Sequence, residues 1–498
     1  MIETHISYVL LAGEFAYKLK KPVKLPFLDY STLEARQRCC AEELRINRRT
    51  APTLYLGVEN VGGDPASPRI GRVEPLLDVA VKMRRFPQEA LLDAMAREGT
   101  LRAEQVDALA EVVARLHENA ARSPAPREAI SAARFATPAL ANFDEIRRAG
   151  VDSALERRLL ALVAWTAAEA DAVCGWVQER AGAGFERECH GDLHLGNVVL
   201  VDARPVAFDA IEFSAGLRWI DVACDAAFTA MDLHRHGLPR FAARFLDRYL
   251  SLTGDYGALP VLRYFMVYRA MVRAKVAALA LAQAVASSPR AVARREELRT
   301  CVELAERLSR SGRSLVVAMH GLPASGKTTV SARLLEALGA VRVRSDVERK
   351  RLAGLASEAR AGAPPGEGIY GAPQTAASYD RLEEVARSAL AGGFPVIVDA
   401  TFARREQRER FRELARARGA SFHLVSCTAP EAKLRERIAR RARLGGDASD
   451  AGTAVLEARI RTDDPLGEDE NAITVDTAAP EADAVVASLA ERLAAPWR

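Results

Sequence analysis

The spacing of apolar residues changes several times along this chain. Residues 5–25 alternate between apolar and polar side chains, with β-branched and aromatic types among them, and predict two or three strands with a turn at residues 12–14. Residues 31–49 have the composition of a helix. Apolar residues then recur at three- and four-residue spacing over residues 91–187 and again over 217–309. Both stretches are therefore expected to be mainly helical.

A short hairpin is predicted between the two helical stretches. Residues 198–201 and 206–208 are apolar runs, and the sequence Asp-Ala-Arg-Pro at 202–205 is typical of a turn. Two such runs joined by a turn favour an antiparallel pair of strands. The closed end of this hairpin is the turn, and polar residues flank its open end.

Three oxygen-bearing side chains stand at that open end. Asp192 and Asn197 precede the first strand, and Asp209 follows the second, so antiparallel pairing is expected to bring them together. Phosphoryl transfer from ATP uses such a set. Asp192 would position the attacking hydroxyl and accept its proton, while Asn197 and Asp209 would hold Mg²⁺. An ordinary hairpin with turn-forming Asp and Asn is the alternative, and the joint spacing of all three residues disfavours it.

A second domain is predicted to begin near residue 312. Residues 314–319 form an apolar run, followed by the sequence GLPASGKT at 321–328 and a helical stretch at 329–338. This is the GxxxxGK[ST] motif in its strand–loop–helix context. Backbone amides of such a loop surround phosphates, Lys327 would reach the β- and γ-phosphates, and Thr328 would bind Mg²⁺. The predicted nucleotide-binding residues are Gly321, Ser325, Gly326, Lys327, Thr328 and Thr329.

Two later strands of this domain also end in acidic residues. Residues 340–343 are followed by Asp346, which is placed to take a hydroxyl proton. Arg349 lies one helical turn further on and could hold a substrate phosphate. The alternative for this pair is a helix-capping Asp with a surface Arg. Residues 396–398 end at Asp399, which is predicted to lie near Mg²⁺ through water.

The remaining part of this domain contains candidate covering elements. The predicted helix at 431–443 is rich in arginine, and Arg437 and Arg440 are expected to neutralise the transferring phosphoryl group. A solvated arginine face is the alternative. Residues 354–373 are rich in Gly, Ala and Pro and are predicted to form a loop over the acceptor. A final strand is expected at 472–476.

The motifs resemble two known kinase families. The sequence HGDLHLGN at 190–197, with FDAIEF at 208–213, resembles the HGD-x4-N catalytic loop of aminoglycoside and choline phosphotransferases, a branch of the protein-kinase-like fold. The P-loop with its D-x-x-R pair resembles P-loop kinases of the zeta-toxin and polynucleotide-kinase-like group. The combination resembles bacterial proteins in which an aminoglycoside phosphotransferase-like domain is fused to an ATP-binding domain.

The first resemblance implies roles for residues outside the hairpin. A lysine on an early strand contacts the α- and β-phosphates in kinase-like folds, and this implies Lys18, with Lys20 on the same face as the alternative. A glutamate of the following helix pairs with that lysine, which implies Glu43, with Glu42 as the alternative. The resemblance further implies that Asp221 braces the catalytic loop. A buried Asp paired with backbone amides explains Asp221 as well.

Composition limits the remaining possibilities. The chain has 498 residues, 49% hydrophobic and 27% charged, which predicts a soluble protein of two to four structural units. A formal net charge of +4 gives no argument for nucleic-acid or membrane binding. Seven cysteines without framework spacing predict a reduced, cytoplasmic protein. No signal peptide and no apolar run of about 18 residues is recognised, so no membrane partner is expected.

The predicted fold has two domains of α/β and α+β class. Residues 1–305 would form a bilobal kinase-like domain, with lobes at about 1–88 and 89–305, and residues 312–498 a P-loop NTPase domain with a parallel sheet. The predicted function is ATP- and Mg²⁺-dependent transfer of the γ-phosphoryl group to a hydroxyl of a small molecule, with two nucleotide sites.

Two alternative functions remain open. The second domain could act as a nucleotide or nucleic-acid 5′-hydroxyl kinase, although the near-neutral charge without basic and aromatic interleaving argues against long nucleic acids as partners. The chain could also be a regulatory ATP-binding switch without small-molecule kinase activity. Asp346 favours chemistry over switching.

Overall fold

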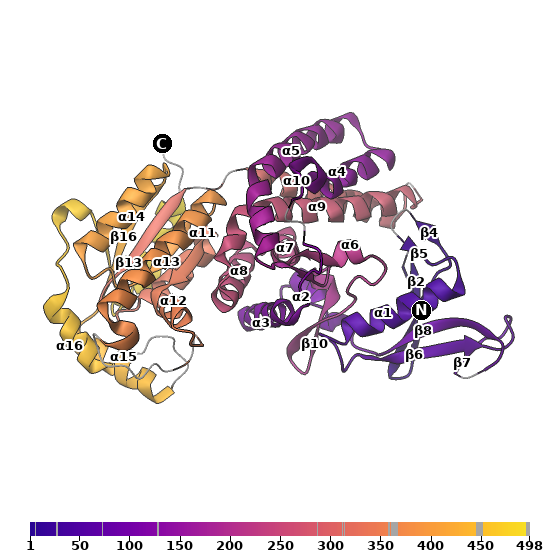
Figure 1. Cartoon of the computed structure of the whole chain (residues 1–498), viewed down its shortest axis with the longest axis horizontal. Helices are drawn as coiled ribbons and strands as arrows, with labels where there is room; N and C mark the ends of the chain where they lie inside the picture. Colours follow the sequence, from indigo (N-terminus) through magenta and orange to yellow (C-terminus); the bar gives the residue numbers. More distant parts are fainter. Residues whose placement is uncertain are drawn as a thin grey trace. The chain divides into compact units, whose positions relative to one another are not determined.

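The computed structural model describes the whole chain except residues 5, 26–27, 72, 127–128, 286, 311, 313, 357–358, 360–366, 445–451 and 495–498 (Figure 1). The chain forms two compact units. The first contains residues 1–238 and 264–306, and the second contains residues 239–263 and 307–498. The two units are described separately below.

The first unit begins with a six-stranded antiparallel sheet in the order β1-β2-β3-β8-β6-β7. Helix α1 (Leu33–Asn47) packs on it, and the Thr32 hydroxyl caps the helix by accepting the Ala35 N–H at 3.2 Å. Gly13 has a φ of 58° in the turn between the second and third strands, which glycine adopts without strain. The strands are β1 (Ile2–Glu3), β2 (Ser7–Ala12), β3 (Phe15–Lys20), β6 (Tyr55–Gly62), β7 (Arg69–Ile70), β8 (Leu76–Arg84) and the separate pair β4 (Lys24–Leu25) and β5 (Leu28–Asp29).

The rest of the first unit is mainly helical, as the apolar spacing predicts. The expected hairpin pairs Val198 with Ala207 and closes at residues 202–203. A second antiparallel pair joins β9 (Glu186–Glu188) to β12 (Trp219–Asp221). The other elements are α2 (Leu92–Glu98), α3 (Ala103–Asn119), α4 (Ala132–Arg148), α5 (Ser153–Gly182), β10 (Val198–Val201), β11 (Arg204–Ala207), α6 (Ala215–Arg218), α7 (Val222–Arg235), α9 (Leu259–Ala282) and α10 (Pro289–Ser309).

Two findings bear on the expected environment of the chain. Among the described residues, helix α5 has the length and composition of a membrane span, with a mean hydropathy of 1.3 in its most apolar window. It carries Glu169 and Asp171 near its middle and packs along α4, so length and composition are weak grounds for a span. All seven cysteines are free thiols.

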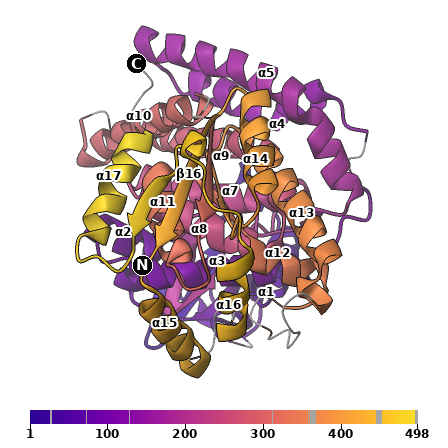
Figure 2. The ribbon, with the colours of Figure 1, turned by 90° about the vertical axis from the view of Figure 1, so that its left-hand side faces the viewer.

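The second unit is a three-layer α/β fold. Its five strands are all parallel in the order β14-β15-β13-β16-β17. Figure 2 shows α11 and α17 on one side of β16 and α13 and α14 on the other. The strands are β13 (Leu315–His320), β14 (Val341–Arg344), β15 (Val396–Asp399), β16 (Ser421–Thr428) and β17 (Ile473–Asp476). The helices are α8 (Pro239–Thr253), α11 (Lys327–Leu338), α12 (Ser345–Leu352), α13 (Ala372–Ala391), α14 (Arg405–Ala417), α15 (Glu431–Leu444), α16 (Thr453–Thr462) and α17 (Ala482–Ala494).

Alternate residues of the central strand face each helical layer, because successive side chains of a strand point to opposite faces. Leu315, Val317 and Met319 share one buried core with the apolar faces of α11 and α17. A doubly covered parallel sheet therefore explains why residues 314–319 are apolar without interruption.

Helix α8 belongs to the second unit, although it precedes α9 in the chain. Ala243 lies in the same core as the central strand, and Asp247 forms an ion pair with Arg342 at 2.7 Å. The single boundary expected between residues 305 and 312 therefore differs from the compact units of the structure. The apolar face of α8 is buried against α11 and β14, and this long-range contact has no local sequence signal.

Candidate active sites

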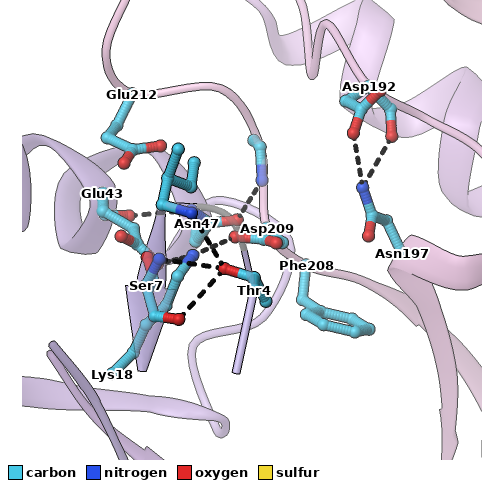
Figure 3. A network of polar contacts seen from close by, with 12 residues as sticks. Thr4, Ser7, Lys18, Glu43, Asn47, Asp192, Asn197, Phe208, Asp209 and Glu212 are labelled. Atoms are coloured by element: carbon cyan, nitrogen blue, oxygen red, sulfur yellow. Dashed lines mark hydrogen bonds and ion pairs between the residues drawn. The ribbon is translucent and has the colours of Figure 1, made fainter. Parts of the chain in front are cut away.

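The predicted catalytic loop lies at the open end of the β10–β11 hairpin. The Asn197 Nδ2 group donates to the Asp192 carboxylate at 3.0 Å and to the Asp192 carbonyl at 2.9 Å. Figure 3 shows the amide oxygen of Asn197 on the side away from Asp192. The Phe208 N–H donates to the Asn197 carbonyl at 2.9 Å, so Asp209 directly follows a residue that is bonded to Asn197. The structure thus brings the three predicted positions to one end of the hairpin.

Two buried aspartates of α7 hold the backbone of this loop. The N–H groups of His190 and Gly191 donate to Asp225 at 2.9 and 3.0 Å. The Leu195 N–H donates to Asp232 at 2.9 Å. Both aspartates are 0% exposed, and each accepts hydrogen bonds that would otherwise be unmade in the interior. The loop conformation is therefore fixed from the helix behind it.

The expectation that Asp221 braces the catalytic loop is wrong. Asp221 accepts the Ala223 N–H at 2.8 Å at the start of α7 and forms an ion pair with Arg180 at 2.8 Å. Asp221 is instead a buried aspartate that pairs with a backbone amide, which was the alternative interpretation. Asp225 takes the bracing position because it lies one turn further along the helix. Asp225 and Asp232 stand seven residues apart in an apolar helix, on one face, and this spacing was the available signal.

The surroundings of Asp192 keep its carboxylate ionised. His194 Nδ1 accepts the Gly196 N–H at 3.1 Å, and Nε2 lies 3.4 Å from both the Asp192 carboxylate and the Arg273 guanidinium. Burial alone would raise the pKa of Asp192, but the nearby His194 and Arg273 outweigh it and lower the pKa well below its ordinary value. An ionised carboxylate is the form that can accept a proton. His194 therefore contacts the predicted base.

The predicted nucleotide lysine and its partners form an ion-pair cluster on the sheet side of the hairpin (Figure 3). Lys18 Nζ lies 2.9 Å from Glu43 Oε1 and also contacts the Asp209 carboxylate. Burial would raise the pKa of Glu43, but Lys18 and Lys20 lower it to about 2. Glu42, the alternative to Glu43, instead pairs with arginines.

Lys18 and Lys20 differ in their access to solvent. Both contact Glu43, but the Lys20 side chain is 0% exposed and that of Lys18 is 13% exposed. Asp209, the other partner of Lys18, has 41% of its side chain exposed. It has a φ of 62°, and its N–H donates to the Tyr55 hydroxyl at 3.1 Å. Of the two lysines, only Lys18 therefore faces the open end of the hairpin.

The P-loop of the second unit has the backbone geometry that phosphate binding needs. Gly321 has a φ of 136°, and a Cβ there would lie 2.4 Å from the Cys427 carbonyl oxygen. Gly326 has a φ of 94°, directly before the first residue of α11. Lys327 Nζ donates to the Gly321 and Leu322 carbonyls at 2.7 and 2.9 Å. Within the part of the chain that is described, the buried Ser325 hydroxyl has no hydrogen-bond partner. These features fit a phosphate group in the loop.

A cavity of about 1290 Å³ opens beside this loop. It is lined by Thr328, Asp346, Arg349 and Asp399, so the structure brings these predicted residues together. Arg349 lies 3.3 Å from the Asp346 carboxylate. Asp399 accepts the Ser331 hydroxyl at 3.1 Å and is 6% exposed.

The two predicted arginines of α15 lie on the same cavity but differ in their contacts. Arg437 donates to the Ala324 carbonyl of the P-loop at 3.1 Å and to the Thr477 hydroxyl and carbonyl at 2.9 Å. Arg440 lines the cavity. Arg437 therefore ties α15 and the loop after β17 to the P-loop, while the role of both arginines in neutralising a phosphoryl group stays a prediction.

The cavity is strongly basic, which the sequence motifs alone did not indicate. Besides Lys327, nine arginines line it, against four acidic residues, among the described residues. Tyr370 also lines it, with the Arg349 guanidinium 5.3 Å from its ring centre. The predicted covering loop at 354–373 falls partly outside the described residues. The lining arginines are Arg333, Arg344, Arg349, Arg404, Arg410, Arg437, Arg440, Arg441 and Arg459.

His320, the last residue before the P-loop, makes the second unit sensitive to acid. Burial, with the nearby charges of Arg408 and Lys327, lowers its pKa to about 4. In the unfolded chain His320 binds a proton near pH 6.5, whereas in the folded chain it stays neutral until about pH 4. The free energy of unfolding should therefore fall as the pH drops from about 6.5 to 4. His320→Gln, which can keep the contact with Ser426 Oγ at 3.0 Å, should remove this loss, which is about 3 kcal/mol at pH 4 for a single group whose pKa falls from 6.5 to about 4. Denaturant unfolding at several pH values measures it, and parallel pH profiles in both proteins would contradict it.

Comparisons with known proteins agree with this division of chemistry. Residues 56–263 match the phosphotransferase enzyme family, and residues 316–466 match the AAA domain family. Uncharacterized proteins of Mycobacterium tuberculosis and Mycobacterium bovis are each 31% identical over 461 residues, covering 92% of this chain and 89% of the relative.

Two solved kinases are also similar to parts of the chain. A gluconokinase from Sinorhizobium meliloti is 26% identical, with a TM-score of 0.25, and the match covers 37% of this chain and 97% of the kinase. A Plasmodium vivax ethanolamine kinase is 11% identical, with a TM-score of 0.37, and the match covers 59% of this chain and 77% of that one.

Proposed function

Because this chain belongs to the family of the two mycobacterial proteins, and is a phosphotransferase enzyme that joins a phosphotransferase domain to a P-loop kinase domain, we propose that it has two nucleotide sites. Each site takes ATP with Mg²⁺ and transfers the γ-phosphoryl group to a hydroxyl of a small molecule. The two clusters of functional groups, one at the β10–β11 hairpin and one at the P-loop, are the observation that carries this proposal.

At the first site, Asp192 accepts the proton of the acceptor hydroxyl. Its lowered pKa and its hydrogen bond from Asn197 support this role, because they keep the carboxylate ionised and oriented. Asn197 and Asp209 offer an amide oxygen and a carboxylate, which are ligands that Mg²⁺ prefers. Lys18 offers a cation for the phosphates, held in place by Glu43. Bound Mg²⁺ and ATP supply the phosphoryl group and the neutralisation of its charge.

At the second site, the P-loop amides and Lys327 would bind the phosphates, and Thr328 and Asp399, which line the same cavity, would hold Mg²⁺ directly or through water. Asp346 lies on the same cavity and takes the acceptor proton. Arg349 contacts Asp346 and therefore lies where the acceptor must approach. Because arginine binds carboxylate and phosphate groups with two parallel hydrogen bonds, the basic lining favours an acceptor that carries an acidic group besides its hydroxyl.

Nucleotide titration of the full chain tests this function. Calorimetry with a non-hydrolysable ATP analogue and Mg²⁺ should give two nucleotides per chain. The acceptors are then sought by phosphate transfer to a panel of neutral polyols, amino alcohols, hydroxy acids and nucleosides. We expect the second site to prefer the hydroxy acids of this panel, because they carry an acidic group besides the hydroxyl. A single nucleotide per chain would contradict the two-site proposal, and two nucleotides without transfer to any hydroxyl would favour the regulatory alternative.

A further inference from the structure

A second buried ion-pair group lies next to the Lys18 cluster. It contains Lys20, the alternative to Lys18 as the nucleotide lysine, and Glu212, to which the motifs gave no role. Lys20 Nζ contacts Glu43 Oε2 at 2.7 Å, the Tyr30 hydroxyl at 3.3 Å and the Glu212 carboxylate. The side chains of Lys20 and Glu212 are 0% and 5% exposed. Neither side chain faces solvent, so neither can take part in binding a ligand directly.

Glu43 contacts both lysines, one with each of its carboxylate oxygens, Oε1 to Lys18 and Oε2 to Lys20. Lys18 then reaches Asp209, and Lys20 reaches Glu212, three residues further along the same segment. The side chains and the backbone from 209 to 212 thus form a closed ring. Figure 3 shows Glu43 with Asp209 on one side and Glu212 on the other.

The proposed function requires one half of this ring to open. With ATP and Mg²⁺ at the first site, Lys18 would bind the phosphates and Asp209 would bind the metal ion, so their direct contact would be exchanged for new ones. The Lys20–Glu212 contact is not exchanged, because both groups are buried away from the site. An ion pair in the interior is hard to break, since each charge would be left unpaired at a cost that burial magnifies.

We propose that Lys20 and Glu212 are positioning residues that keep the segment carrying Asp209 fastened to Glu43 of α1 while Lys18 exchanges the Asp209 carboxylate for phosphate. This inference rests on the proposed function of the first site. Its consequence is that Asp209 meets Mg²⁺ in a fixed position, and the affinity for Mg²⁺ is the property that depends on Glu212.

Other contacts of the same segment support this reading. The Ala210 N–H donates to the Asn47 side chain at 2.8 Å, and the Ile211 N–H donates to the His190 carbonyl at 3.0 Å. The backbone of residues 209–212 is therefore hydrogen-bonded both to α1, through Asn47, and to the catalytic loop, through His190. Lys20 and Glu212 add the only side-chain ion pair, among the described contacts, that joins it to the sheet without using Asp209.

The test uses the full chain carrying Lys327→Ala, so that nucleotide binding reports the first site. The Mg²⁺ concentration for half-maximal binding of an ATP analogue is measured with and without Glu212→Gln, which preserves shape and can still accept from Lys20 and Tyr30. Loss of a direct outer partner of a metal ligand typically weakens metal affinity about 10- to 100-fold. Glu212 acts on Asp209 through Lys20, Glu43 and Lys18, so we expect the Mg²⁺ concentration to rise by about tenfold, the lower end of that range. Glu3→Gln is the matched control, because Glu3 pairs with Lys21 at the exposed edge of the same sheet.

A merely structural ion pair predicts a different pattern. The double variant Lys20→Met, Glu212→Met removes both charges, and its packing should return the melting temperature toward that of the parent. If positioning is the role, the raised Mg²⁺ requirement persists in the double variant. An unchanged Mg²⁺ requirement in Glu212→Gln and in the double variant, with a parent that binds nucleotide normally, would overturn this inference alone. A parent that binds no nucleotide would overturn the proposed first site and this inference with it.

Discussion

Replacing Asp192 with Asn should lower the rate of phosphoryl transfer at the first site by about 10²- to 10⁴-fold, the usual contribution of a positioned general base. Asparagine has nearly the same shape but cannot accept the hydroxyl proton. The hydrogen bond between residues 192 and 197 can persist through the remaining carbonyl oxygen, so the loop should stay folded. The measurement is kcat with the acceptor found in the panel, together with the affinity for the ATP analogue, which should change little.

Asp202→Asn is the matched control for this prediction. Asp202 lies at the closed end of the same hairpin, has a φ of 49°, and is exposed. Asparagine tolerates such a left-handed conformation as well as aspartate does. The same chemical change at this position should leave kcat within about twofold, as expected for a surface substitution away from the site. Equal kcat values for Asp192→Asn and the parent would show that another group takes the proton.

Local sequence patterns predicted those parts of the sites that are built from neighbouring residues. The β10–β11 hairpin follows from two apolar runs and a turn, and its pairing brings Asn197 beside the residue before Asp209. Asp192 is then held to Asn197 by hydrogen bonds. The P-loop is likewise a continuous segment whose glycines adopt left-handed backbone angles. The resemblance to kinases supplied Lys18 and Glu43, which the antiparallel sheet and α1 bring into contact across 25 residues.

The parts that the sequence did not predict depend on contacts between distant segments. Asp225 binds the N–H groups of a loop 34 and 35 residues earlier, so only the fold reveals that it, rather than Asp221, braces that loop. Lys20 and Glu212 are 192 residues apart. The basic cavity is lined by arginines from five helices, from the end of β14 and from the loop before α14, and their spacing in the sequence does not indicate that they meet. Helix α8 belongs to the second unit because its apolar face packs against α11. The composition of α8 does not predict which helix it packs against.

Replacing Lys327 with Ala should abolish transfer at the second site, with a loss of about 10²- to 10³-fold or more, comparable to removing one charged donor from a transition state. Lys327 Nζ already lies on the inner side of the P-loop, bound to two loop carbonyls, from which it can reach the phosphates. Nucleotide stoichiometry should fall from two to one, and transfer at the first site should continue. Lys433→Ala is the matched control, because Lys433 pairs with Glu436 on the surface of α15. Two nucleotides per chain with undiminished transfer in Lys327→Ala would show that the P-loop lysine is dispensable, which contradicts the role proposed for the second site.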